Sequence, residues 1–77
     1  MNIPLDVAMA ELDLIPKGSL PQNIFRDTYF CLRENSLGQQ PTVDGNRQAA
    51  WDAALAIVRK NWPGFVPECD PALLAST

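Results

Sequence analysis

The side chains available to this chain limit the chemistry it can perform. It has 77 residues, no histidine and two cysteines, Cys31 and Cys69. Without histidine, acid–base catalysis at neutral pH needs a tuned carboxylate, lysine or cysteine, and a nucleophile needs a base beside it. Neither pattern is visible, the glycines are too isolated for a phosphate-binding loop, and two thiols cannot complete a four-ligand zinc site. We therefore predict that the chain is not an enzyme and has no metal site or cofactor.

Arginine and tyrosine supply the alternative chemistry. Two arginines seven residues apart share one helical face with a tyrosine at its edge, an arrangement that could hold a phosphate group or stack on a base. Acidic residues in the same stretch could instead pair with the arginines and leave an ordinary solvated surface. The alternative hypothesis is thus a nucleotide or nucleic-acid site. Its residues would be Arg26, Tyr29, Arg33 and also Arg47 or Lys60.

Phe30 is the candidate anchor for a protein partner. On a helical projection it lies among two arginines and two acidic residues, and an aromatic side chain inside a polar rim is typical of a binding hot spot. A lone aromatic residue can equally be covered by another part of the chain. The predicted partner-binding residues are Phe30, Arg26, Arg33 and Tyr29.

Three helices are predicted to position these side chains. The clearest is 44–62, in which one narrow stripe contains Trp51, Leu55, Val58 and Trp62. Asp44 is its expected N-cap. Two further helices are predicted near 3–13 and 20–36, and a short helical turn follows Asp70. The fold class is therefore all-α, a small three-helix domain covering 1–77 as a single domain.

The apolar pattern also predicts which way each helix faces. In 3–13, Leu5, Met9 and Leu12 are expected to face the core beside Ala8. In 20–36, Ser19 and Gln22 form a predicted capping box, and the inner sector contains Leu20, Ile24, Phe25, Thr28, Tyr29, Cys31 and Leu32. The stretch 28–33 has high strand propensity, so a strand is its rival assignment. Phe65 and Val66 are expected to return to the core, and both cysteines are expected to be small core residues with free thiols.

Two surplus apolar surfaces predict a homodimer. The second side of the first helix carries Ile3, Val7 and Leu14, and the outward side of the third carries Ala49, Ala53 and Ala56. A two-fold axis would cover one of these with its own copy. Local folding of the helix ends explains the first surface without a partner, and the high helix propensity of alanine explains the second.

Charge and hydropathy complete the sequence-based prediction. The net charge is −3, and residues 1–16 contain three acids and no base, which argues against strong non-specific binding to nucleic acid. No apolar run reaches the roughly 20 residues that span a membrane, and the N-terminus does not resemble a secretory signal, so a cytoplasmic location is predicted. We expect a small acidic protein-binding module, compatible with the accessory proteins of phages and other mobile elements that bind and inhibit a host or defence protein.

Overall fold

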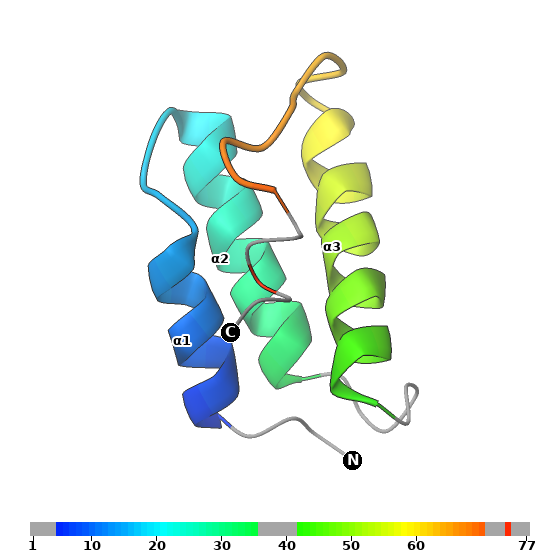
Figure 1. Cartoon of the computed structure of the whole chain (residues 1–77). Coiled ribbons are helices and arrows are strands. Elements are labelled where there is room, and N and C mark those ends of the chain that lie inside the picture. Colours follow the sequence, from blue (N-terminus) through cyan, green and yellow to red (C-terminus); the bar gives the residue numbers. More distant parts are fainter. Residues whose placement is uncertain (1–4, 36–41, 71–73, 75–77) are drawn as a thin grey trace.

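The computed structural model describes residues 5–35, 42–70 and 74 of the chain. They form three helices, α1 (Leu5–Leu14), α2 (Leu20–Glu34) and α3 (Val43–Arg59), and no strand occurs in the described ranges. The all-α prediction is confirmed, and the strand alternative for 28–33 is wrong. In Figure 1, α2 lies between α1 and α3, and the segment after α3 returns in front of α2.

The start of each long helix differs in detail from the prediction. Thr42, not Asp44, caps α3, because its Oγ1 accepts a hydrogen bond from the Gly45 amide at 2.9 Å. Ser19 precedes α2 but makes no side-chain capping bond, so the predicted capping box is absent. Asn23 replaces it. Its amide group exchanges two hydrogen bonds with the backbone of Gly18, at 3.0 and 3.1 Å.

Helix α3 ends earlier than predicted. That helix ends at Arg59, and the amides of Asn61 and Trp62 both donate to the Val58 carbonyl in an irregular turn. Trp62 therefore lies outside the helix, although it still packs against the core. The predicted last residue of 20–36 and the first two of 3–13 lie outside the described residues.

The apolar core is built around aromatic rings from α2 and α3. Trp51 is only 5% exposed, which confirms its predicted burial, and its ring meets Phe25 edge-on with centroids 4.9 Å apart. Tyr29 meets Trp51 in the same way at 5.7 Å. Phe65 packs against this cluster as predicted, whereas Val66 is 73% exposed and does not return to the core.

The chain beyond Asp70 also contributes to the core. Leu74 is helical and fully buried, whereas the rest of the predicted terminal turn lies outside the described residues. Leu74 belongs to the same buried cluster as Trp51 and Ile15. The core thus draws on the segments after α1 and α3 as well as on the helices themselves.

The orientation of α1 differs most from the prediction. Its buried residues are Ala8 and Glu11, whereas Leu5 is 50% and Met9 52% exposed. Leu12 is half-buried. The physical reason is that the Glu11 carboxylate pairs with arginine in the interior, so an ion pair and not an apolar stripe determines which side of α1 faces inward.

The inner face of α2 is also displaced from the predicted sector. Its buried residues are Gln22, Phe25, Tyr29 and Arg33. Leu20 and Cys31 are exposed, so their predicted burial is wrong, because the i, i+4, i+8 row of Phe25, Tyr29 and Arg33 faces inward instead. Cys69 is half-buried and packs against the core, and both thiols are free.

Candidate functional site

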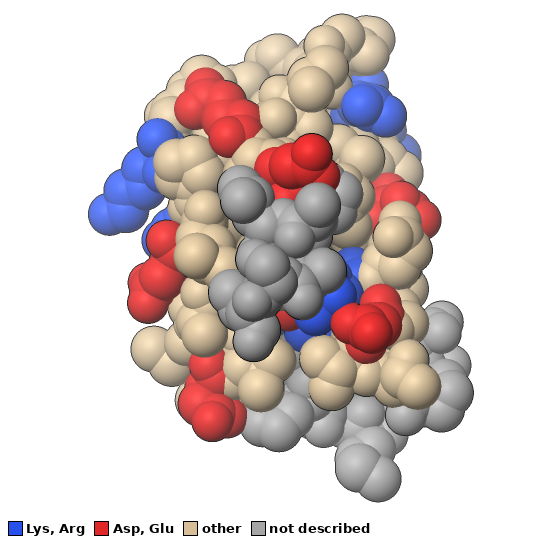
Figure 2. Space-filling view, viewed as in Figure 1, with Lys and Arg blue, Asp and Glu red and all other residues tan. Residues whose placement is uncertain are grey.

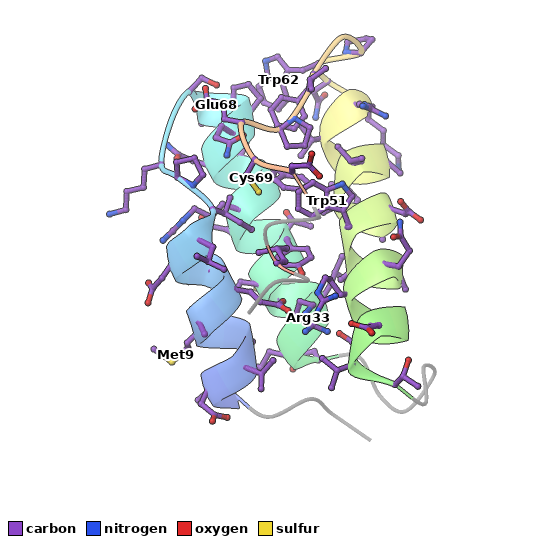
Figure 3. The ribbon with its side chains drawn as sticks, viewed as in Figure 1. Met9, Arg33, Trp51, Trp62, Glu68 and Cys69 are labelled. Carbon is purple, nitrogen blue, oxygen red and sulfur yellow. The ribbon has the colours of Figure 1, made fainter. Side chains whose placement is uncertain are left out.

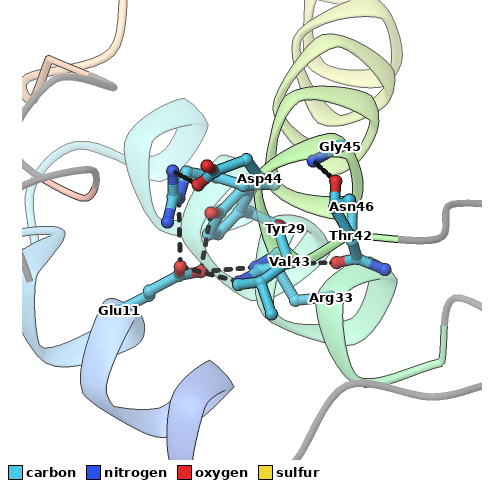
Figure 4. A network of polar contacts seen from close by, with 9 residues as sticks. Glu11, Tyr29, Arg33, Thr42, Val43, Asp44, Gly45 and Asn46 are labelled. Atoms are coloured by element: carbon cyan, nitrogen blue, oxygen red, sulfur yellow. Dashed lines mark hydrogen bonds and ion pairs between the residues drawn. The ribbon is translucent and has the colours of Figure 1, made fainter.

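A buried polar network joins the three helices (Figure 4). At its centre is Arg33 of α2, whose side chain is completely buried. Its Nε and Nη2 groups donate to the two carboxylate oxygens of Glu11, at 2.5 and 2.7 Å. This is a bidentate, charge-assisted pair, the strongest geometry available to these two side chains. It connects α1 directly to α2.

Tyr29 adds a third group to the same carboxylate. Its hydroxyl donates to Glu11 Oε2 at 2.8 Å, one helical turn before Arg33 on α2. Burial raises the pKa of the Tyr29 hydroxyl far above its usual range, and the hydrogen bond to Glu11 and the charge of that carboxylate raise it further. Nearby Arg33 and Arg47 lower it only partly. Tyr29 therefore stays protonated and acts as a hydrogen-bond donor.

The beginning of α3 supplies the remaining partners. Arg33 Nη1 donates to the side-chain oxygen of the buried Asn46 and to the Val43 carbonyl, the latter at 3.2 Å. Arg47 donates through Nε to Glu11 Oε1 at 3.2 Å and through Nη1 to Asp44 Oδ1 at 2.7 Å. Glu11 therefore holds α1 against α3 as well as against α2.

The charges of this network are balanced. Burial opposes the charge on Arg47, but hydrogen bonds to Glu11 and Asp44 raise the pKa of its guanidinium above the ordinary value. Two arginines face two carboxylates, and across the described residues every buried side-chain nitrogen or oxygen has a hydrogen-bond partner. A satisfied network of this kind stabilises one arrangement of the helices, since losing Glu11 would leave the Nε and Nη2 groups of the buried Arg33 unpaired.

A second, uncharged polar contact lies at the opposite end of α2. Gln22 is fully buried; its Nε2 donates to the Pro16 carbonyl and its Oε1 accepts from the Glu68 amide, both at 3.1 Å. It thus joins the α1–α2 connection to the segment after α3. Gly18 lies close by, where an added Cβ would stand 2.9 Å from a Glu68 carboxylate oxygen. Gln22 Cγ lies 3.0 Å from the same position, so a larger side chain here would have to displace the Glu68 or Gln22 side chain.

The predicted cationic face is not present on the surface. Tyr29 and Arg33 are both fully buried, because their polar groups pair with Glu11 and their neighbours belong to the core. Arg26 is the exception. It is partly exposed, donates through Nε to the Ile15 carbonyl at 3.0 Å, and lies 3.9 Å from Asp27. The structure therefore brings Tyr29 and Arg33 together, but inside the bundle.

Phe30 lies half-buried on α2. The rim of two arginines predicted around it is wrong, because Arg33 is interior and Arg26 is bonded to the end of α1. Whether Phe30 contacts a partner stays a prediction.

The residues predicted for a dimer interface differ in their exposure. Leu14 and Ala56 are exposed, and the half-buried members are Val7, Ala49 and Ala53. Ile3 lies outside the described residues. The dimer itself stays a prediction.

Comparison with known proteins adds no relative. No protein-family model matches the chain, and neither a curated protein nor a solved structure is significantly similar to it. Among the residues that the structure describes, no group of three or more acidic or cysteine side chains is placed to bind a metal ion. No helix in the same ranges has the length and apolar character that crossing a lipid bilayer requires.

Proposed function

We propose that the chain is a small, non-catalytic module that binds another protein. The observation that carries the proposal is the burial pattern of α1. The charged Glu11 is buried, whereas the apolar Leu5 and Met9 are about half exposed. Leu5 and Met9 are one turn apart on the same side of the helix. Large apolar side chains that a small domain leaves together on its surface are typical of contact sites.

The buried network supports this proposal by its completeness. The Glu11 carboxylate accepts from Tyr29, Arg33 and Arg47, so its oxygens are occupied as structural acceptors. A carboxylate held in this way suits a scaffold better than proton transfer, which requires a group that can exchange its proton with a substrate.

The nucleotide or nucleic-acid alternative has less support. It required Arg33 and Tyr29 to reach a ligand together, and both are fully buried. Arg47 is bonded to two carboxylates, so a phosphate would have to compete with Glu11 and Asp44 for its guanidinium.

The finer features of the function remain predictions from sequence. These are inhibition of a host or defence protein, a relation to phage or mobile-element accessory proteins, and function as a homodimer.

Affinity capture tests the proposal. The full chain, immobilised through an added terminal tag, is exposed to a lysate of the source cells, and a retained protein is purified and titrated against it by calorimetry. We expect saturable one-to-one binding with a negative heat-capacity change, the signature of apolar burial. If nothing is retained, or if the retained protein does not saturate the chain in solution, the binding-module proposal is wrong.

A further inference from the structure

The outward side of α1 is an apolar and acidic surface. We call it the outer face of α1, and its members are all exposed: Leu5, Asp6, Met9, Ala10, Asp13 and Leu14. Figure 3 shows Met9 pointing away from the bundle. Leu5 and Met9 lie along one edge of this face and Leu14 on the other, with the two aspartates between them.

The charge of this face has one sign. Asp6 and Asp13 are two helical turns apart and point the same way, and α1 contains no lysine or arginine. The third acid of the helix, Glu11, is buried and paired with Arg33, so it neither adds to the surface charge nor competes for a partner. Figure 2 shows acidic side chains along the edge of the molecule that α1 forms.

The same face is held in a fixed orientation. Glu11 joins α1 to both other helices through Arg33 and Arg47, and the Arg26 guanidinium binds the Ile15 carbonyl just beyond the last turn. A face whose backbone is already ordered loses little conformational entropy when a partner docks.

We propose that the outer face of α1 is the docking site of this module, and that its occupant is a partner segment with apolar side chains flanked by lysine or arginine, as on a basic amphipathic helix. This inference rests on the proposed function and specifies the chemistry of its partner. The apolar edge made by Leu5 and Met9 supplies the contact area, and Asp6 and Asp13 select a positively charged segment.

A second copy of the chain fits this face less well. In a symmetric pair the same patch meets itself, so Asp6 and Asp13 of one copy would face those of the other. Like charges brought together at an interface oppose association. The complementary occupant is therefore a cationic partner.

Two synthetic peptides test the inference directly. One is a helix-forming peptide of leucine and lysine with a single apolar stripe, and the other has every lysine replaced by glutamate. We expect the lysine peptide to bind the full chain, with binding weakened by added salt and with amide chemical-shift changes concentrated in Leu5–Leu14. The glutamate peptide should bind at least ten-fold more weakly.

Matched variants locate the site. Met9→Ser should weaken binding of the lysine peptide at least ten-fold, whereas Ile57→Ser, which changes a comparably exposed apolar residue on α3, should leave it within two-fold. The double change Asp6→Asn with Asp13→Asn should weaken binding and reduce its salt dependence, and Asp52→Asn on α3 should do neither. Circular dichroism of each variant checks that the fold is retained.

Three results obtained with the peptides or with the chain alone would overturn the inference. These are equal binding of both peptides, shift changes outside α1, and a concentration-dependent dimer in light scattering that Met9→Ser dissociates, which would identify a second copy as the occupant. A failure of the docking-site proposal can be told apart from a failure of the binding-module proposal. A natural partner that Met9→Ser retains as well as the unchanged chain does would refute the docking site while leaving the module intact.

Discussion

Tyr29 divides the interior of this protein into two halves that are equally buried but chemically unlike. On one side its ring lies against Phe25 and Trp51, and on the other its hydroxyl bonds to the Glu11 carboxylate beside Arg33. The aromatic half depends on contact area, which changes gradually when side chains shift. The polar half depends on direction, because each donor needs an acceptor at the right distance and angle.

The comparison explains why α1 is oriented as it is. Its apolar residues lie on several sides, so burial alone favours no single rotation of the helix strongly. Glu11 does favour one, because its carboxylate must meet Arg33 and Tyr29 once all three are removed from water. The polar half of the interior therefore determines the rotation of α1, which the aromatic half leaves undetermined.

The first of two equally large predicted effects comes from a substitution in the polar half. Glu11→Leu should lower the free energy of unfolding by about 3 to 5 kcal/mol, because it leaves the Arg33 guanidinium buried without its counter-charge. Urea denaturation followed by circular dichroism measures the loss. Adding Arg33→Met should recover at least about 1 kcal/mol by removing the unpaired charge. Asp13→Leu, on the exposed side of the same helix, is the control and should change stability by about 0.5 kcal/mol or less.

An additive result would contradict this account. If the double variant is as unstable as the sum of its two single variants, Glu11 and Arg33 do not stabilise the fold as a pair.

The second prediction concerns a substitution in the aromatic half. Trp51→Ala should cost about 3 to 5 kcal/mol by leaving a cavity beside Phe25 and Tyr29. A domain of this size is expected to have about 4 to 12 kcal/mol in total, so this loss is a large part of its free energy of unfolding. Unlike the loss at Glu11, this loss should be partly recovered by a large apolar residue, and Trp51→Phe should be the milder change. A shift of the denaturation midpoint below a tenth of its value would show that Trp51 contributes little to the core.

The two halves also differ in how well the sequence predicts them. The number of helices and the burial of Trp51 follow from apolar spacing, since the hydrophobic effect places side chains by type. The fate of Glu11 does not follow in this way, because an acid on a helix is usually solvated and its partner lies 22 residues away in the chain. One signal was present: Phe25, Tyr29 and Arg33 are spaced i, i+4, i+8, which places an arginine on the aromatic face.

The same reasoning explains the error at the surface. The helical spacing of Leu5 and Met9 predicts that both face the core, since leucine and methionine are buried more often than glutamate. Pairing with Arg33 reverses that ranking, since a charged group can be buried when its partner is buried with it. The exposed apolar edge on which the docking proposal depends is therefore a consequence of a long-range ion pair.

The smallest predicted effect concerns Tyr29, which belongs to both halves, and it grows as the pH rises above 10. The pKa of Tyr29 is raised in the folded state above its ordinary 10.0, so the folded chain holds this proton more tightly than the unfolded chain. The stability this provides is complete below pH 10 and is lost as the pH rises toward the folded pKa, at about 1.4 kcal/mol for each pH unit. Because Tyr29 is the single tyrosine, its ultraviolet titration reports this one group, and we expect tyrosinate to appear only as the protein unfolds.

Cys69 contributes in the same direction, since burial and then the charge of Asp70 raise the pKa of its thiol above the ordinary 9.0. Tyr29→Phe separates the two contributions. At neutral pH it should lower the free energy of unfolding by about 1 to 2 kcal/mol, because it removes the hydrogen bond to Glu11. Above pH 10, Cys69→Ala should still lose stability as the pH rises, and adding Tyr29→Phe to it should make that loss smaller. Ionisation of Tyr29 near pH 10 in a chain that stays folded would instead show that water reaches its hydroxyl and the polar half of the interior.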